Sequence, residues 1–241
     1  MKIAIIGYGR MGKMIEEAAL QKGHTIGLVI DLNNQADLTA RNIASHDVAI
    51  EFTTPASAWN NISVCFDADT PVVSGTTGWL ERLPELKERC LRENHAFVYS
   101  SNFSIGVNIL FHINRQLAKL INPLDEYKPR IEEIHHTKKL DAPSGTAISL
   151  AQGMIGEINR LQNWELSDTA GDQTIPVKAI RADDITGIHE VIYESDVDTL
   201  SVRHSAKNRK GFVRGTILAA EFIVDKKGFF TMEDVLGFNK I

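Results

Sequence analysis

Cysteine is nearly absent from this sequence, with only Cys65 and Cys90 among 241 residues. Two cysteines are too few for the disulfide framework of a small secreted domain, and nothing near them has the spacing of a zinc site. A chain of this length can bury a hydrophobic core without such cross-links. We therefore expect a globular protein of one or two domains in the reducing cytoplasm, without a metal site.

Long apolar runs and an excess of positive charge are also missing. No stretch reaches the roughly 18 apolar residues of a membrane-spanning helix. Glycines interrupt the apolar N-terminus and no cleavage-site pattern follows, so no signal peptide is predicted. The 26 lysines and arginines stand against 31 aspartates and glutamates, a net charge of −5. This balance argues against nucleic acid or an anionic membrane as the main partner.

Apolar runs alternate with helical segments in the first hundred residues. Strands are predicted at Lys2–Ile6, Thr25–Ile30, Val48–Phe52, Pro71–Ser74 and Ala96–Ser100. Helical spacing of apolar residues begins at Met11, and further helices are predicted after Pro55 and over Glu81–Asn94. Strands connected by helices form a doubly wound parallel sheet with helices on both faces. The predicted fold class of this region is therefore α/β.

The pattern changes after about Ser104. Helices are predicted at Val107–Leu120 and Ser144–Ile158, and strands at Arg130–His136, Ile175–Ile180, Ile188–Tyr193 and Thr199–Arg203. Because these strands follow one another, we expect an inserted α+β domain with a mixed sheet over residues 105–211. A last helix, Phe212–Val224, would return the chain to the first domain, formed by 1–104 and 212–241. The polar stretch Arg160–Asp172 lacks periodicity and is predicted to be a mobile loop.

A glycine-rich turn separates the first predicted strand from the first helix. Gly7, Gly9 and Gly12 form the pattern GxGxxG, and Asp31 ends the second strand 19 residues later. In a dinucleotide site these glycines allow a tight turn, approach of the pyrophosphate and close helix packing, while the acid binds a ribose hydroxyl. The helix N-terminus adds free N–H groups. Alone the pattern could be an ordinary turn, but in this context it predicts dinucleotide binding by residues 1–104 and 212–241.

Leu32 follows Asp31, at the place where an arginine would most simply meet the 2′-phosphate of NADP. We therefore favour NADH as the cofactor. NADPH stays open because Arg10 and Arg41 could reach a phosphate, although both could equally be exposed surface charges.

Two further loops follow strands of the same predicted sheet. They are Gly75, Thr76, Thr77 and Gly78 after one strand, and Ser100, Ser101, Asn102 and Phe103 after another. Ligands of open α/β sheets bind at the carboxyl ends of strands, which favours contact with the cofactor. Spacing alone does not distinguish the first loop from a simple turn. Between the glycines, Tyr8, Arg10 and Met11 complete the candidate cofactor residues.

The segment Glu133–Ala147 is the most unusual part of the chain. It holds two histidines and two lysines within five residues, namely His135, His136, Lys138 and Lys139, at the end of a predicted strand. In an acidic protein such a cluster suits an anionic substrate and proton transfer near neutral pH. Along a continuing strand, His135 and Lys139 would share one face while the other two would share the opposite face.

A predicted helix start follows this cluster. Pro143 presets the backbone, and Ser144, Gly145 and Thr146 open the helix with N–H groups that suit a substrate carboxylate. Each residue also has an ordinary explanation, since single histidines are usually structural and serine often only caps a helix. Taken together in a chain with a dinucleotide site, they favour a catalytic interpretation.

In these motifs the sequence resembles the dihydrodipicolinate reductase family, also called 4-hydroxy-tetrahydrodipicolinate reductase. The matching segments are GYGRMG, SGTTG, SSNFSIGVN, EIHHTKKLDAPSGTA and HSAKNRKGF, in family order over nearly the full chain. The HHTKKLDAPSGTA segment is specific to this family. The resemblance implies a cytoplasmic oxidoreductase of lysine and diaminopimelate biosynthesis, with a Rossmann-type domain and an α+β domain that forms a homotetramer.

The resemblance also implies a reaction and roles for individual residues. The reaction is NAD(P)H-dependent reduction of (4-hydroxy-)dihydrodipicolinate, a small anionic dicarboxylate, to tetrahydrodipicolinate. His135 matches the proton donor and Lys139 the catalytic, substrate-binding lysine. The matches to substrate contacts are His136, Gly145, Thr146 and Arg209. Gly75–Thr77 and Ser100–Phe103 match loops that contact the cofactor.

Other functions remain possible from the residues alone. Another reductase of a small dicarboxylate or amino acid also needs a carboxylate site and a proton donor, and the DAPSGTA segment decides against it. A thioester-forming semialdehyde dehydrogenase needs a loop cysteine, whereas Cys65 and Cys90 lie in predicted helices. A catalytically silent dinucleotide-sensing protein would have no use for His135 beside Lys139. Leu32 departs from the arginine of some family members, which puts NADP preference in doubt.

Overall fold

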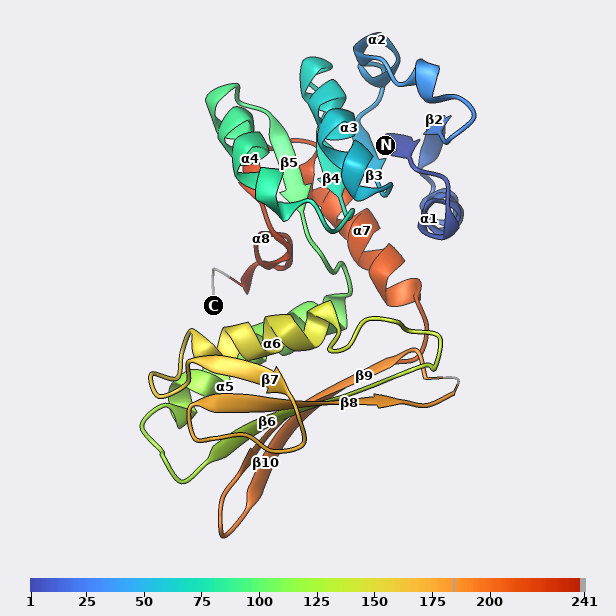
Figure 1. Ribbon diagram of the computed structural model, residues 1–241. Helices are drawn as coiled ribbons and strands as arrows, with labels where there is room; N and C mark the ends of the chain where they lie inside the picture. Colours follow the sequence, from blue (N-terminus) through green and yellow to red (C-terminus); the bar gives the residue numbers. More distant parts are fainter. Residues whose placement is uncertain (184, 239–241) are drawn as a thin grey trace. The chain divides into compact units, whose positions relative to one another are not determined.

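The computed structural model describes residues 1–183 and 185–238. The chain forms two compact units (Figure 1): unit 1 is Met1–Ile105 with Lys210–Ile241, and unit 2 is Gly106–Arg209. Unit 2 is therefore inserted between the two segments of unit 1. The sequence predicted domain boundaries between residues 104 and 105 and between residues 211 and 212. In the structure the boundaries between the units lie between residues 105 and 106 and between residues 209 and 210.

Unit 1 is built on a six-stranded sheet of order β11-β5-β4-β3-β1-β2. The strands are β1 (Lys2–Ile6), β2 (Thr25–Ile30), β3 (Val48–Glu51), β4 (Val72–Ser74), β5 (Ala96–Tyr99) and β11 (Gly228–Phe230). Every neighbouring pair is parallel, so all carboxyl ends lie along one edge. The strand order reverses at β1, which lies between β2 and β3. The predicted doubly wound α/β sheet is confirmed.

Helices cover both faces of this sheet (Figure 1). They are α1 (Arg10–Gln21), α2 (Ala40–Ile43), α3 (Pro55–Asp67), α4 (Leu83–Arg92), α7 (Lys210–Ile223) and α8 (Met232–Leu236), with 3-10 turns at Gln35–Asp37 and Leu80–Arg82. In β1, Ile3 and Ile5 are buried with α1 and α7, whereas Ala4 and Ile6 are buried with α3 and α4. Because both faces are covered, this strand is apolar at successive positions instead of alternate ones.

Helix α7 packs in unit 1 with its Gly215 close to the backbone of Phe103. A Cβ on Gly215 would lie 1.7 Å from the carbonyl oxygen of Phe103. Phe103 lies just before the chain leaves unit 1, and α7 follows its return. The contact therefore joins the two segments of the unit, and the predicted C-terminal helix packs in the core with β1 and β3.

Unit 2 contains a mixed five-stranded sheet of order β10-β9-β6-β8-β7. The strands are β6 (Lys128–His135), β7 (Asn163–Leu166), β8 (Thr174–Arg181), β9 (Gly187–Glu194) and β10 (Thr199–Ala206). Strand β6 is parallel to β8 and antiparallel to β9, which is antiparallel to β10. Helices α5 (Ile105–Ile121) and α6 (Gly145–Ile155) lie along this sheet (Figure 1). Leu110, Leu150 and Ile131 belong to their shared core, as an α+β domain requires.

Strand β7 corrects the expectation of a mobile loop over Arg160–Asp172. Its four residues pair in parallel with β8 at the edge of the sheet. Of these residues only Trp164 is half-buried, and the others are exposed. A short edge strand with one partly buried side chain has too little apolar periodicity to be recognised from sequence.

The helices of the described residues are short for a bilayer. The longest, α5, has 17 residues. None of them combines the length and the apolar character needed to cross a membrane.

We expect Gly215→Ala to destabilise the protein by about 1–3 kcal/mol, because its Cβ would overlap the carbonyl oxygen of Phe103. Thermal or urea unfolding measures this change. Gly171→Ala is the matched control, since a Cβ there meets nothing within 4 Å. Equal stability of the two variants would contradict the packing of α7 described above.

Candidate active site

The carboxyl edge of the unit 1 sheet carries the glycine-rich turn between β1 and α1. Gly7 has a φ of +98°, and a Cβ on it would lie 2.0 Å from the carbonyl oxygen of Phe52. A Cβ on Gly12 would lie 2.2 Å from the carbonyl oxygen of Gly7, whereas one on Gly9 would meet nothing within 4 Å. Packing therefore requires two of the glycines, and Gly9 leaves open space at the N-terminus of α1. A pyrophosphate fits this arrangement.

Phe52 joins this turn to two neighbouring loops. It follows β3, and its ring lies against Gly75, where a Cβ would be 2.2 Å from a ring carbon. The centroids of the Phe52 and Phe103 rings are 5.8 Å apart. The ends of β1, β3, β4 and β5 therefore meet around Phe52. Candidate cofactor residues from three separate segments are thus brought together.

Asp31 follows β2 on the other side of β1. Its Oδ1 accepts a hydrogen bond from the backbone N–H of Asn33 at 2.7 Å, and its own N–H donates to the Asn34 side chain at 2.8 Å. Among the described residues no hydrogen bond uses Oδ2. The carboxylate is therefore oriented, with one oxygen suited to a ribose hydroxyl. Leu32 is 85% exposed and adds no charge beside it.

The remaining candidate cofactor residues divide into two groups. The exposed or half-buried ones are Tyr8, Arg10, Met11, Thr77 and Ser101. By contrast, Thr76 is buried and its hydroxyl donates to Glu51 at 2.9 Å. The Ser100 hydroxyl bonds to the backbone of Asn102, and Phe103 is buried. Members of this second group hold the loops in shape.

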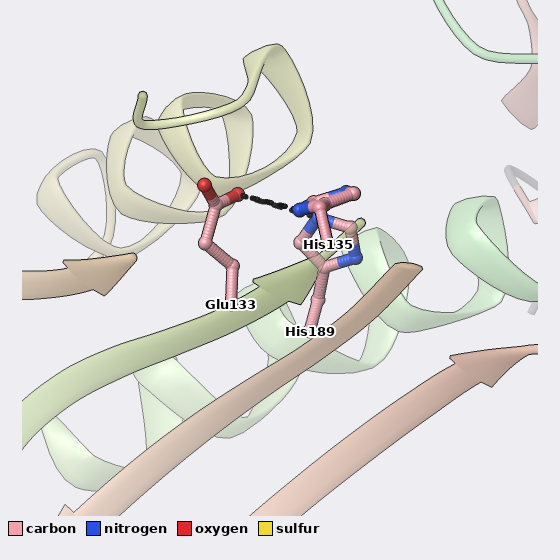
Figure 2. Close-up of side chains that lie close together, drawn as sticks. All are labelled: Glu133, His135 and His189. Atoms are coloured by element: carbon pink, nitrogen blue, oxygen red, sulfur yellow. Dashed lines mark ion pairs between the residues drawn. The ribbon is translucent and has the colours of Figure 1, made fainter. Parts of the chain in front are cut away.

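In unit 2 the register of the strands brings titratable residues together. Glu133 on β6 is paired with His189 on β9, which is paired with His204 on β10. His135, the last residue of β6, lies two residues beyond Glu133 on the same face. Its ring meets that of His189 edge-on, with centroids 4.9 Å apart. Figure 2 shows the Glu133 carboxylate pointing toward the two rings.

The fully buried carboxylate of Glu133 holds this cluster together. Both of its oxygens accept from the backbone N–H of Ser144 at 3.1 Å, and the Arg181 guanidinium lies 3.3 Å from Oε1. Oε2 lies 3.7 Å from Nδ1 of His135 and 3.6 Å from Nε2 of His189. Burial acts to raise the pKa of Glu133, but hydrogen bonds from His189 and Ser144 and the charge of His135 lower it to about 2. The group is therefore an anion near neutral pH.

The environment of His135 favours its neutral form. Burial is the main cause, and it lowers the pKa of His135 to about 4 together with the charges of His189, Lys139 and Arg181. The Glu133 carboxylate acts in the opposite direction. The ring is therefore neutral near pH 7 in the free protein, and added negative charge nearby would favour its protonation.

Lys139 lies in a turn, because β6 ends at His135. Its backbone N–H donates to the carbonyl oxygen of His136 at 3.1 Å. The predicted alternation of faces through Lys138 and Lys139 is therefore wrong, since alternation requires an extended backbone. The ammonium of Lys139 donates to both carboxylate oxygens of Asp141 at 2.8 Å, yet its charge still acts on His135. Lys138 is exposed.

Helix α6 begins beside the cluster, with Ser144 as its N-cap residue. The Ser144 hydroxyl accepts from the N–H of Ala147 at 3.2 Å and lies 3.1 Å from Nε2 of His189. Its own N–H donates to Glu133, so both polar groups of this candidate substrate residue are engaged within the protein. Gly145 is exposed, and a Cβ on it would meet nothing within 4 Å. A carboxylate has room to approach the helix at this residue.

Three further candidate substrate residues lie around this region. His136 and Thr146 are half-buried and adjoin His135 and Gly145 in sequence. Arg209 is exposed and is the last residue of unit 2. In the part of the chain that the structure describes, no hydrogen bond or ion pair links Arg209 to Glu133.

Glu133, His135 and His189 also offer ligand atoms within 4.8 Å of one another, a spacing that a metal ion could use. However, both carboxylate oxygens already accept hydrogen bonds from Ser144, and the Arg181 cation lies against one of them. A second cation would be repelled there. We therefore interpret the three residues as a site that holds and moves a proton.

Arg181, His189 and His204 were not identified from the sequence. They join the site through the pairing of β6, β8, β9 and β10, which lie far apart in the chain. One signal was available: inward positions alternate along β9, and His189 is a polar residue at such a position. A buried polar residue in that pattern needs a hydrogen-bonding partner.

The two cysteines do not offer a nucleophile. Cys65 and Cys90 are free, buried thiols in α3 and α4, as the sequence predicted. Burial raises the pKa of both thiols, to about 11 for Cys90. Because the thiolate is the reactive form, this environment argues against a thioester mechanism.

Two family models match the sequence along most of its length. The model described as "Dihydrodipicolinate reductase, N-terminus" matches residues 1–103, and the one described as "Dihydrodipicolinate reductase, C-terminus" matches residues 106–236. The two matches together cover more than half of the chain and meet near the first boundary between the units.

Similar proteins are found among curated sequences and solved structures. The 4-hydroxy-tetrahydrodipicolinate reductase of Christiangramia forsetii is 47% identical over 98% of both chains. That of Neisseria gonorrhoeae is 31% identical, over 99% of this chain and 98% of its own. A dipicolinate-bound dihydrodipicolinate reductase from Paenisporosarcina sp. TG-14 has a TM-score of 0.77 at 21% identity, over 96% of this chain and 97% of that one. This structure is evidence for the fold alone.

We expect two substitutions to move the pKa of His135 in opposite directions. Glu133→Gln lowers it below about 4, because the carboxylate favours the protonated ring, whereas His189→Gln raises it by removing an opposing charge. Titration of the histidine resonances by NMR measures both changes. Glu132→Gln, on the same strand but the opposite face, is the control and leaves the pKa unchanged. Shifts of the same sign would contradict the electrostatic account.

Proposed function

Because the chain belongs to the dihydrodipicolinate reductase family, we propose that it reduces (4-hydroxy-)dihydrodipicolinate to tetrahydrodipicolinate with a nicotinamide cofactor, in lysine and diaminopimelate biosynthesis. The observation that carries this proposal is the buried cluster of Glu133, His135 and His189 beside the start of α6. It combines a titratable donor with an opening suited to a carboxylate. A binding protein without activity would not need this combination.

Unit 1 binds the cofactor. The N–H groups at the start of α1 hold the pyrophosphate and Asp31 holds a ribose hydroxyl, which the open space at Gly9 and the oriented carboxylate support. The loops Gly75–Thr77 and Ser100–Phe103 border the reduced nicotinamide, which supplies a hydride when bound. NADH is preferred because Leu32 offers no charge to a 2′-phosphate.

NADPH remains usable because Arg10, the first residue of α1, is exposed and its guanidinium is long and flexible enough to approach a phosphate near the turn. Arg41 lies in α2, where the carbonyl oxygen of Ile43 accepts a hydrogen bond from Thr70 before the amino end of β4, so it lies toward the opposite edge of the sheet. The cofactor preference is therefore one of degree.

Unit 2 binds the dicarboxylate substrate. One carboxylate lies at the N-terminus of α6 with Gly145 and Thr146, while His136, Lys139 and Arg209 contribute polar contacts and positive charge. The exposure of Gly145 supports this placement. When the substrate binds, the Lys139 ammonium leaves the Asp141 carboxylate and pairs with a carboxylate of the substrate. The ammonium therefore has an anionic partner before and after binding.

His135 donates the proton that accompanies the hydride. Its Nδ1 faces the Glu133 carboxylate, so Nε2 is the donor atom. Because the pKa of His135 is about 4, its ring is neutral in the free protein. A bound dianionic substrate raises this pKa, so the ring becomes protonated. One hydride and one proton together reduce one double bond of dihydrodipicolinate, and the 4-hydroxy form in addition loses its hydroxyl group as water. Ser144 and His189 act by positioning Glu133 and the His135 ring.

We expect the enzyme to work in the cytoplasm as a homotetramer, as the family resemblance implies. Two buried free cysteines suit a reducing compartment. The net charge of −5 gives no reason to expect nucleic acid or a membrane as a partner.

The purified protein is expected to oxidise NADH only when the cyclic product of aspartate semialdehyde and pyruvate is present. Loss of the near-ultraviolet absorbance of NADH measures the reaction, and the same assay with NADPH gives the cofactor preference. The control is the same mixture without aspartate semialdehyde or without pyruvate. If absorbance is lost at the same rate without the cyclic compound, the proposed substrate is wrong.

Lys139→Ala is expected to lower turnover more than about tenfold with the fold intact, because a positive charge beside the developing anion is removed. Steady-state kinetics and circular dichroism measure activity and folding. Lys138→Ala is the matched control, since Lys138 is the exposed neighbour with the same charge. Unchanged kinetics in the Lys139 variant would assign the substrate charge to another residue.

A further inference from the structure

Unit 1 contains a buried carboxylate that the proposed function does not use. Glu51 is the last residue of β3 and is 0% exposed. Its partners are the hydroxyl groups of Thr53, of Ser74 at 2.6 Å and of Thr76 at 2.9 Å. Within the described residues, no lysine, arginine or histidine forms an ion pair with it. Glu51 is therefore held by neutral donors alone.

N–H donors set the direction of two of these hydrogen bonds, those from Thr53 and Thr76. The backbone N–H of Thr53 donates to the Thr76 hydroxyl at 2.7 Å, and the amide of Asn61 donates to the Thr53 hydroxyl at 3.1 Å. The hydroxyl groups of Thr53 and Thr76 thus accept from N–H groups, and their own protons are available to Glu51. Oε1 of Glu51 therefore accepts from two hydroxyl groups, and the Ser74 hydroxyl lies at Oε2. These neighbours suit a carboxylate at this position.

The burial of this charge calls for a physical reason. A carboxylate removed from water without a nearby cation destabilises the fold, and neutral hydrogen bonds offset only part of that effect. Glutamine has nearly the same volume and could bond to the same hydroxyls without a charge. A positive charge that is present only in a complex would explain why the negative one is retained.

The strand order places Glu51 on one side of the cofactor site. In a doubly wound sheet the dinucleotide spans the point where the strand order reverses. Here β2, with Asp31 for a ribose, lies on one side of β1, and β3, β4 and β5 lie on the other. Thr53 and Thr76 belong to the loops after β3 and β4. Glu51 therefore lies beneath the loops that border the nicotinamide half.

We propose that Glu51 is a positioning residue whose buried negative charge favours the positively charged nicotinamide ring of NAD⁺ over the neutral ring of NADH. This inference rests on the proposed cofactor role of unit 1. Loss of a hydride from NADH creates the positive charge, so a fixed negative charge near the ring favours hydride donation. Glu51 acts across Thr53 and Thr76, because its own side chain is completely buried.

The test compares the binding of NAD⁺ and NADH to Glu51→Gln by calorimetry, without substrate. We expect the dissociation constant of NAD⁺ to rise about tenfold relative to that of NADH, because a charge–charge attraction is lost. Ser74→Ala and Glu51→Asp keep the charge while altering the same network, and both leave the ratio near that of the unmodified protein. If Glu51→Gln changes both constants by the same factor, Glu51 only holds the loops and the proposal is overturned.

Glu51→Ala provides a second test, because the shortened side chain leaves room for a small molecule. Added formate restores the ratio of the two dissociation constants, whereas neutral formamide does not. If neither neutral variant folds, the carboxylate serves the fold itself and the proposal is overturned. Failure of the unmodified protein to bind NADH would instead contradict the proposed role of unit 1, which separates the two outcomes.

Discussion

The free-energy penalty of a buried carboxylate is the constraint on which the candidate sites of both units depend. Glu51 in unit 1 and Glu133 in unit 2 are completely buried near the carboxyl ends of β3 and β6. Such a group is tolerated only where hydrogen-bond donors surround it. The donors include Thr76 in one unit and the N-cap residue Ser144 in the other. The hydrogen bonds that each carboxylate requires therefore hold a loop in place. In unit 1 this loop carries candidate cofactor residues, and in unit 2 it carries candidate substrate residues.

The two carboxylates are satisfied in different ways, and the difference matches the proposed chemistry. Glu133 has the Arg181 cation and two histidines beside it, so its charge is paired and acts on the protonation of His135. Glu51 has only hydroxyl partners. In the proposed function a cationic ligand compensates its charge. One carboxylate would then control a proton donor, and the other would favour the oxidised form of the hydride donor.

Local sequence patterns predicted the fold, and they brought forward part of the candidate site. The apolar run of β1 and the glycines after it were recognised because a buried strand requires apolar residues, and a tight turn requires glycines, at neighbouring positions of the sequence. Strand β7 was missed because only one residue of this edge strand is half-buried, so its sequence has no apolar pattern. His189 and Arg181 reach Glu133 through strand register, which no local window contains. The resemblance supplied the proposed role of His135, but not the groups that set its protonation.

The protonation of the two buried carboxyl groups tests this account most directly. Neutron diffraction from a deuterated crystal grown near neutral pH locates the protons. We predict no deuteron on Glu51 or Glu133, and hydroxyl deuterons of Ser74 and Thr76 directed at Glu51. A deuteron bonded to an oxygen of either carboxyl group would contradict the account.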